Sequence, residues 1–474
     1  MTATLPTTAY RLHSLRVRAA GPVVWMLFVL LIALPAFILV AITDDLTTEL
    51  LLSYVIILYS GARLTFLAFR REHCYFQITF CLFVYCWLGL ASAAQVASRY
   101  YPWAASRQSS ANLIETNLII LLGIGAYELG LYFYRRKSAG RSPWLRLSFP
   151  TNIRYIALTA LSLAASFYSI LAQGGVGAVM VQRNELQSTA QPMTKGDGLI
   201  YSSLQHGPPL VALLVTISLL TSGFYTGRRK RLPQVLLIIL IFYNLIANYP
   251  PALPRVTLGS AAVSIVFVLI ASRPRLKPAL VLGLTLALLI LFPYLDYFRA
   301  AGGYTSYDLQ HPREQLIHKP DYDAFQMLSN TVSVVSEQGT TGGSNLAGAF
   351  LFFVPRSLWA SKAYGSGQAV GEIVGYRMLN LSSPLWAELY FAAGLVGVSI
   401  GFLLMGYSTG WIQRASQSPS SPMLSLVAYG AGFQVFMLRG DLQNSVAYSL
   451  PSIILILMFI VGGGHSSRHR PRFS

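Results

Sequence analysis

Long apolar segments follow one another along most of the chain, separated by short polar stretches. A helix needs about twenty apolar residues to cross a hydrocarbon core. The pattern therefore predicts an all-α polytopic membrane protein with about twelve transmembrane helices. The predicted spans cover residues 22–43, 48–68, 75–98, 111–134, 152–172, 201–225, 233–249, 256–272, 278–297, 384–408, 422–438 and 443–463.

Composition agrees with this pattern. Hydrophobic residues make up 54% of the chain and charged residues 11%, which is typical of membrane proteins. The formal net charge is +18, but the basic residues gather at the ends of apolar segments. This distribution favours orientation signals and anionic-lipid contacts over nucleic-acid binding. We expect one membrane domain, 1–474, without an internal repeat.

The basic clusters also predict an orientation. Cytoplasmic loops of membrane proteins carry an excess of lysine and arginine. With twelve spans, one side of the membrane receives the clusters at residues 70–71, 135–146, 228–231, 273–277 and 468–472. We therefore expect a multi-pass protein of the cytoplasmic (inner) membrane with both termini in the cytoplasm.

Two of the predicted outside loops are unusually long, 173–198 and 299–383. The second contains the apolar run 346–359 (LAGAFLFFVPRSLW), which is too short to cross a bilayer. We expect this run to form a short interfacial or re-entrant helix, since loops of this length in compact proteins are often functional.

Four cations in these loops are candidates for binding a lipid-linked phosphate or diphosphate. Arg356 and Lys362 follow the apolar run, near the depth of lipid headgroups, and guanidinium groups form forked hydrogen bonds to phosphate. Alternatively, both extend to ordinary anionic lipid. Arg183 and Arg299 lie in different loops, so they either converge on the same diphosphate or are solvated loop charges.

Two further residues are candidates for catalysis. Glu388 lies near the start of predicted span 384–408, where an acid is costly and suggests function. It is either a general base for a sugar hydroxyl or a structural partner of a nearby cation. His311 stands in the polar stretch 311–320 and is either a base or a solvated side chain. No motif predicts a metal or another cofactor.

Residues 354–359 (VPRSLW), Lys362, 387–391 (AELYF) and 394–397 (GLVG) resemble a stretch of the oligosaccharide repeat-unit polymerases, the Wzy-type O-antigen and exopolysaccharide polymerases. This family often has proline after the lysine, where the present chain has Ala363. The arrangement of spans and long outside loops is also similar.

The resemblance implies a GT-C-like membrane glycosyltransferase. Such an enzyme joins undecaprenyl-diphosphate-linked oligosaccharide repeat units into a surface polysaccharide at the outer face of the cytoplasmic membrane, with inversion and without a metal. Arginines neutralise the leaving diphosphate. The implied partners are the lipid bilayer, the polyprenyl-diphosphate-linked oligosaccharide, and a chain-length regulator and flippase of the same pathway, with no nucleic acid.

Two alternatives fit the same pattern. An O-antigen-ligase-type transferase of the same fold would hand a finished glycan to a different acceptor. A twelve-helix transporter is also compatible with the number of predicted spans, although the halves of the chain show no repeat and the outside loops are rich in cations.

Overall fold

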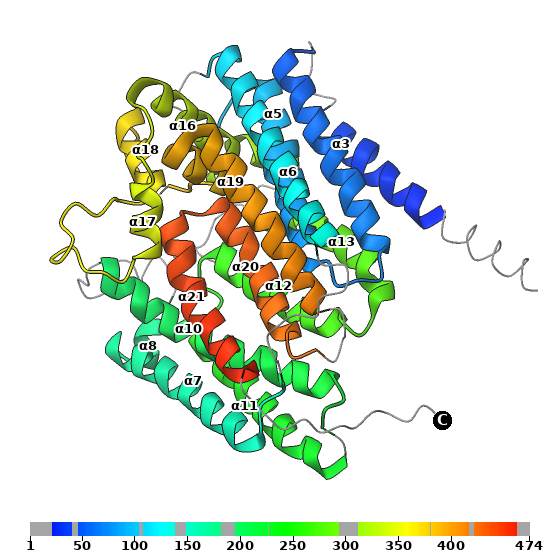
Figure 1. Ribbon diagram of the computed structural model, residues 1–474, viewed down its shortest axis with the longest axis vertical. Coiled ribbons are helices and arrows are strands. Elements are labelled where there is room, and N and C mark those ends of the chain that lie inside the picture. Colours follow the sequence, from blue (N-terminus) through cyan, green and yellow to red (C-terminus); the bar gives the residue numbers. More distant parts are fainter. Residues whose placement is uncertain are drawn as a thin grey trace, which may run out of the picture.

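The computed structural model describes residues 21–39, 46–103, 108–137, 148–181, 195–225, 227–292, 311–379, 381–416 and 421–461. In these ranges the secondary-structure elements are helices, most of them packed side by side in one bundle (Figure 1).

Ten helical segments are long and apolar enough to cross a membrane. Several are composed of consecutive helical elements, among them Gly21–Leu39, which contains η1 (Val29–Ala33) and α2 (Leu34–Leu39). The other nine are α3 (Thr48–Phe69), α4–η2–α5 (Tyr75–Phe83, Val84–Leu90, Ala91–Ser98), α6 (Ser110–Lys137), α7 (Asn152–Ala172), α10 (Lys195–Thr221), η3–α11 (Gly227–Lys230, Arg231–Ala247), η4–α13–η5 (Pro274–Leu276, Lys277–Leu286, Ala287–Leu291), α19 (Leu385–Ala415) and α21 (Leu442–Ile460).

Two predicted spans form shorter apolar helices. They are α12 (Arg255–Ile270) and α20 (Leu424–Arg439), each 16 residues long. The prediction of an all-helical, multi-pass membrane protein is therefore confirmed, with ten full-length candidate spans in the described residues where twelve were expected.

Helices α6 and α19 pack closely at the centre of the bundle because glycines line their contact. A Cβ atom at Gly130 of α6 would overlap the carbonyl oxygen of Leu403, and one at Gly406 of α19 would overlap that of Tyr127. Small residues allow membrane helices to approach in this way. Beside them the buried ring of Trp386 lies 4.1 Å from that of Phe402.

Helix α19 contains a break at Ala393 and Gly394. Gly394 has φ 59°, a left-handed conformation that glycine adopts without steric cost. The break frees the carbonyls of Phe391 and Ala392, which accept hydrogen bonds from the backbone N–H groups of Thr341 (2.9 Å) and Gly343 (3.0 Å). The segment 385–392 is fully buried. It is thus a separate short piece ahead of the longer helix.

A group of shorter helices covers one end of the bundle, which we call the cap. It consists of residues 311–379 and 381–384 and includes a small core of its own around Met327, Val370 and Tyr376. The predicted loop 299–383 is therefore folded wherever it is described. The cap contains α15 (Pro312–His318), η7 (Pro320–Tyr322), α16 (Ala324–Gln338), α17 (Ser344–Phe350) and α18 (Ser366–Val374).

The apolar run 346–359 is helical only in its first part. Helix α17 ends at Phe350, and turns follow, such as the one closed by Val354 N–H and Leu351 O (3.1 Å). Pro355 would stop a helix from continuing through the whole run, because proline has no N–H to donate and disfavours helical geometry in the residue before it. In the other long loop, 173–198, the structure describes the short helix α8 (Val176–Val179).

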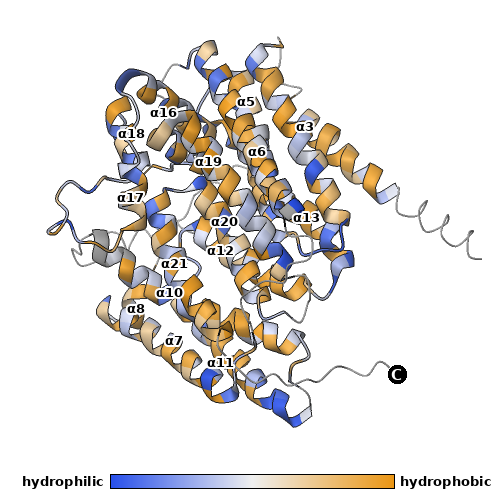
Figure 2. Ribbon diagram, in the orientation of Figure 1, coloured by the Kyte–Doolittle hydropathy of each residue, from blue (hydrophilic) through white to orange (hydrophobic). Residues whose placement is uncertain are grey.

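Hydrophilic residues gather in the turns beside α13 and α11, away from the cap (Figure 2), and the sequence of these turns is rich in arginine and lysine, as at 70–71, 228–231 and 273–277. Here Lys277 Nζ donates hydrogen bonds to the carbonyl oxygens of Arg70 and Glu72. We call this the basic end.

Candidate functional site

Arg356 and Lys362 lie in the turns that follow α17, and both bind the backbone of their own loop. Lys362 Nζ is buried and donates to the carbonyl oxygens of Phe352 (2.7 Å) and Val354 (3.1 Å). Burial, with a smaller contribution from Arg356, lowers the pKa of Lys362. Arg356 donates to the carbonyl oxygens of Lys362 (2.6 Å) and Ala363 (3.3 Å), and its guanidinium lies 4.0 Å from the Tyr364 ring centroid. Both cations thus stabilise the loop.

Glu388 lies on the buried segment ahead of the α19 break and is only 2% exposed. Its Oε1 accepts a hydrogen bond from the backbone N–H of Leu442 in α21 (3.0 Å). Its Oε2 accepts from Ser366 Oγ of α18 (2.5 Å) and from Asn345 Nδ2 of α17 (3.2 Å). The carboxylate therefore joins three helices to α19.

A second carboxylate lies at the same helix end. Asp441 caps α21, and its Oδ1 accepts from the backbone N–H groups of Gln443 (2.9 Å) and Asn444 (3.3 Å). The partial positive charge of a helix N-terminus stabilises acids placed there. This explains how the fold accommodates Glu388 and Asp441 together.

The remaining candidates do not join this group in the described contacts. His311 caps α15 by accepting from Arg313 N–H (3.2 Å), and its ring lies 4.6 Å from that of Phe37. Arg183 and Arg299 lie outside the described residues. The structure thus brings Arg356 and Lys362 together in one loop, and it connects that loop through α17 to Glu388.

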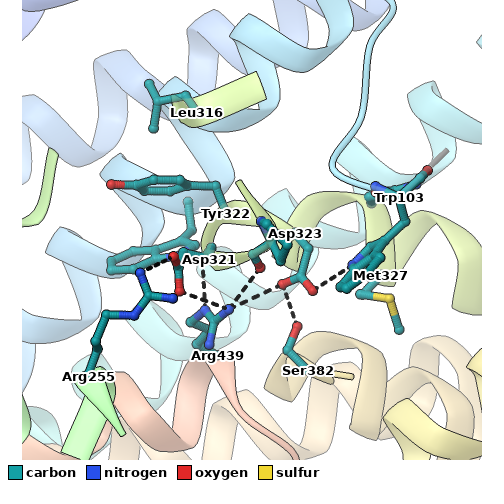
Figure 3. Close-up of polar contacts among 12 residues, drawn as sticks. Trp103, Arg255, Leu316, Asp321, Tyr322, Asp323, Met327, Ser382 and Arg439 are labelled. Atoms are coloured by element: carbon teal, nitrogen blue, oxygen red, sulfur yellow. Dashed lines mark hydrogen bonds and ion pairs between the residues drawn. The ribbon is translucent and has the colours of Figure 1, made fainter. Parts of the chain in front are cut away.

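A cluster of four charges that the sequence analysis did not identify lies where the cap meets the bundle (Figure 3). It consists of Arg255, Asp321, Asp323 and Arg439, and we call it the arginine–aspartate cluster. Arg255 Nη1 lies 2.7 Å from Asp321 Oδ2, and Arg439 Nη2 lies 3.6 Å from Asp323 Oδ1. The arginines stand at the ends of the short helices α12 and α20, and both aspartates come from the cap.

Neutral groups complete this cluster. Asp323 accepts hydrogen bonds from Ser382 Oγ (2.5 Å) and from Trp103 Nε1 (2.9 Å). Burial raises the pKa of Asp323, although the charge of Arg439 opposes that shift. Arg439 also donates from Nε to the carbonyl oxygen of Asp321 (2.8 Å) and from Nη2 to that of Pro320 (2.9 Å). These bonds attach the turn of η7 to α20.

An apolar pocket lies below the cluster, between α4–η2, α12, α13–η5 and α20. It is small and partly open to the surroundings. Two of its wall residues connect it to the charges above. Trp87 donates from Nε1 to the carbonyl oxygen of Asp321 (2.7 Å), and the guanidinium of Arg255 lies 5.7 Å from the Phe292 ring centroid. Further walls are formed by Leu82, Val256, Gly259, Val263, Leu288, Val435 and Arg439.

This arrangement suits an amphiphilic ligand. Its walls are almost entirely apolar, Arg439 is among the residues that line it, and the guanidinium of Arg255 packs on the ring of the wall residue Phe292. The contacts of Arg439 involve Nε and Nη2, which leaves Nη1 without a hydrogen-bond partner among the described residues. Pockets with apolar walls and a few polar groups at one point are typical of ligand sites.

No group of three or more histidine, cysteine, aspartate and glutamate side chains in the described part of the chain is arranged to hold a metal ion. Comparisons with protein-family models, with curated proteins and with solved structures find no match for this chain.

Proposed function

We propose that this protein is a GT-C-like membrane glycosyltransferase that joins polyprenyl-diphosphate-linked oligosaccharide units into a polysaccharide at the outer face of the cytoplasmic membrane. The observation that best supports this proposal is the apolar pocket, which lies next to the charged groups of the arginine–aspartate cluster. A lipid-linked diphosphate has the matching shape, with an isoprenoid chain at one end and a dense negative charge at the other.

In this proposal the pocket takes the isoprene units nearest the diphosphate. The walls formed by Leu82, Val263 and Leu288 exclude water from this part of the carrier. The diphosphate then lies at the level of Arg255 and Arg439, and the sugar extends into the cap. The cap end is accordingly the outer end of the protein, which agrees with the cytoplasmic orientation expected for the basic end.

In this proposal the arginines stabilise the leaving group of the reaction. When the acceptor hydroxyl attacks the sugar, negative charge develops on the leaving diphosphate, and preorganised cations stabilise this charge in the transition state. Asp321 and Asp323 hold both guanidinium groups in place before the ligand binds.

The cluster itself contains two positive and two negative side chains, so a diphosphate needs additional positive charge. Nη1 of Arg439 offers unused N–H donors. Arg299 lies outside the described residues and stays a proposed diphosphate contact on the grounds of sequence alone.

The pocket assignment is tested by filling the pocket. Nothing lies within 4 Å of a Cβ atom at Gly259, so Gly259→Leu places a side chain in the pocket without a backbone clash. Gly283→Leu is the matched control, because Gly283 is also free of neighbours but does not line the pocket. We expect a polyprenyl diphosphate to raise the melting temperature of wild type and Gly283→Leu, and to bind Gly259→Leu about tenfold more weakly.

The same variants are then assayed for glycan elongation from lipid-linked repeat units. Gly259→Leu should shorten the product ladder, and Arg439→Lys should lower the rate on the order of a hundredfold by removing the forked donor. Arg414→Lys at the exposed basic end should leave the ladder unchanged. Equal binding by both leucine variants would contradict the pocket assignment, and transport of the lipid-linked unit without elongation would contradict the glycosyltransferase proposal.

A further inference from the structure

The loop between α17 and α18 buries a charged lysine side chain and exposes several large apolar side chains. We call residues 350–364 the hydrophobic loop. The ammonium of Lys362, whose side chain is buried, faces backbone carbonyls inside the loop. Large apolar side chains point outward, with exposed fractions of 57% for Phe350, 56% for Phe353 and 81% for Leu358.

This arrangement is held by bonds within the loop. The backbone N–H groups of Leu358 and Trp359 both bind the carbonyl oxygen of Pro355 (3.1 Å each). Arg356 ties the start of the loop to its end through the carbonyl oxygens of Lys362 and Ala363. These hydrogen bonds fix the backbone of the loop and so keep its apolar side chains exposed. An exposed apolar patch of this kind indicates an interaction surface.

The loop starts at the level where two membrane helices begin. Asn345 of α17 donates to Glu388 in the first turn of α19. The same carboxylate accepts from Leu442, the first residue of α21. Helix α17 thus lies at the end of two candidate spans, and Figure 1 shows the chain after it reaching outward beyond the helical body. This is the depth at which a bilayer surface would surround the protein.

We propose that the hydrophobic loop inserts into the lipid surface on the cap side, with Phe353 and Leu358 among the acyl chains and Arg356 at the level of the lipid phosphates. Aromatic and aliphatic side chains beside a basic residue are typical of interfacial insertion. The guanidinium of Arg356 over the Tyr364 ring combines a cation with a ring that favours the interface. This inference depends on the membrane-spanning architecture and not on the glycosyltransferase proposal.

Site-specific fluorescence tests the insertion. Leu358→Cys and Phe353→Cys are each labelled with nitrobenzoxadiazole in protein reconstituted in phosphatidylcholine–phosphatidylglycerol vesicles. The natural cysteines Cys74, Cys81 and Cys86 are buried and give little background. Ser336→Cys on the exposed end of α16 is the water-exposed control, and Ile238→Cys on α11, at a 57% exposed position of a candidate span, is the lipid-exposed control.

We expect the labels at 353 and 358 to be quenched several-fold more strongly by spin-labelled lipid than the label at 336, and to be protected from aqueous iodide as at 238. Quenching by iodide and not by spin-labelled lipid at both loop positions would contradict the proposal. Protection from both quenchers would contradict it as well, because it would show that protein covers the loop.

Discussion

At the scale of single residues, the environment of Glu388 distinguishes between its two possible roles. A general base needs contact with its substrate. The Glu388 side chain is only 2% exposed, and its oxygens accept three hydrogen bonds, from Leu442 N–H on one side and from Ser366 and Asn345 on the other. The geometry favours the structural role, in which the carboxylate holds the cap against α19 and α21.

This role makes opposite predictions for two substitutions. Glu388→Gln keeps one oxygen for Leu442 N–H, and its amide can donate to Ser366, whose hydroxyl can reorient to accept. Asn345 Nδ2 loses the carboxylate but keeps the backbone carbonyl of residue 388 and Ser366 Oγ as acceptors. We therefore expect Glu388→Gln to retain most of its stability and its activity. Glu388→Ala leaves the Leu442 N–H and the Ser366 hydroxyl without this acceptor in a buried site, so we expect a loss of about 2 to 4 kcal/mol in the free energy of unfolding.

Thermal unfolding in lipid nanodiscs, together with the glycan elongation assay, distinguishes the two roles. A Glu388→Gln protein that is fully folded but inactive would contradict the structural role and indicate that Glu388 acts as a base.

The ion pairs that attach the cap to the bundle could not be predicted from the sequence. Arg255 and Arg439 stand at the ends of apolar segments, where an arginine commonly marks an orientation signal or contacts lipid. Their partners, Asp321 and Asp323, are distant in sequence from both. Only folding brings them together. One feature of the sequence could have pointed to these arginines. Both lie at the predicted outside end of their spans, where positive residues are less common.

At the scale of helices, hydropathy predicted most elements because each span requires a long apolar run. The observed α7, Asn152–Ala172, coincides with the predicted span 152–172. Hydropathy did not predict the break in α19, since Ala393 and Gly394 are as compatible with a span as their neighbours. It also did not predict the end of α17 at Phe350, because the apolar run continues beyond that residue.

The contact between α6 and α19 predicts a position-specific effect of adding one methyl group. Gly130→Ala would place its Cβ against the Leu403 carbonyl and 2.7 Å from Tyr407 N, whereas nothing lies within 4 Å of a Cβ at Gly125. We expect Gly130→Ala to reduce the free energy of unfolding by about 1 to 3 kcal/mol. Gly125→Ala, on the same helix, should be neutral or slightly stabilising.

Thermal melts of the purified variants measure this difference, and the shared helix serves as the control for propensity. Equal melting temperatures for the two alanine variants would show that the helices separate without cost.

At the scale of the whole molecule, alternating helix direction separates the cap from the basic end. Apolar runs were sufficient to predict the multi-pass architecture, and the orientation read from the charge clusters stays a prediction. The apolar pocket was not predictable, because its walls at Leu82, Val256, Leu288 and Val435 belong to four separate apolar segments. These residues have no sequence pattern that distinguishes them from lipid-facing ones.

The orientation proposed for the protein is testable by cysteine labelling. Thr151 precedes α7 at the basic end, Ser336 lies on α16 in the cap, and both are exposed. In sealed right-side-out membrane vesicles, an impermeant maleimide should label Ser336→Cys directly. Thr151→Cys should be labelled only after permeabilisation, because positive residues retain that end in the cytoplasm.

Unmodified protein, whose natural cysteines are buried, is the background control. Direct labelling of Thr151→Cys with protection of Ser336→Cys would reverse the topology and place the cap inside the cell.

The shortness of α12 and α20 has a consequence for the charges at their ends. Sixteen helical residues rise about 24 Å, less than the hydrocarbon thickness of about 30 Å. The cap turn at Asp321 lies against the ends of both helices, where the side chains of Arg255 and Arg439 are only 13% and 14% exposed. Salt screens ion pairs that are largely buried less than it screens exposed ones. We therefore expect the attachment of the cap to the bundle to depend little on ionic strength.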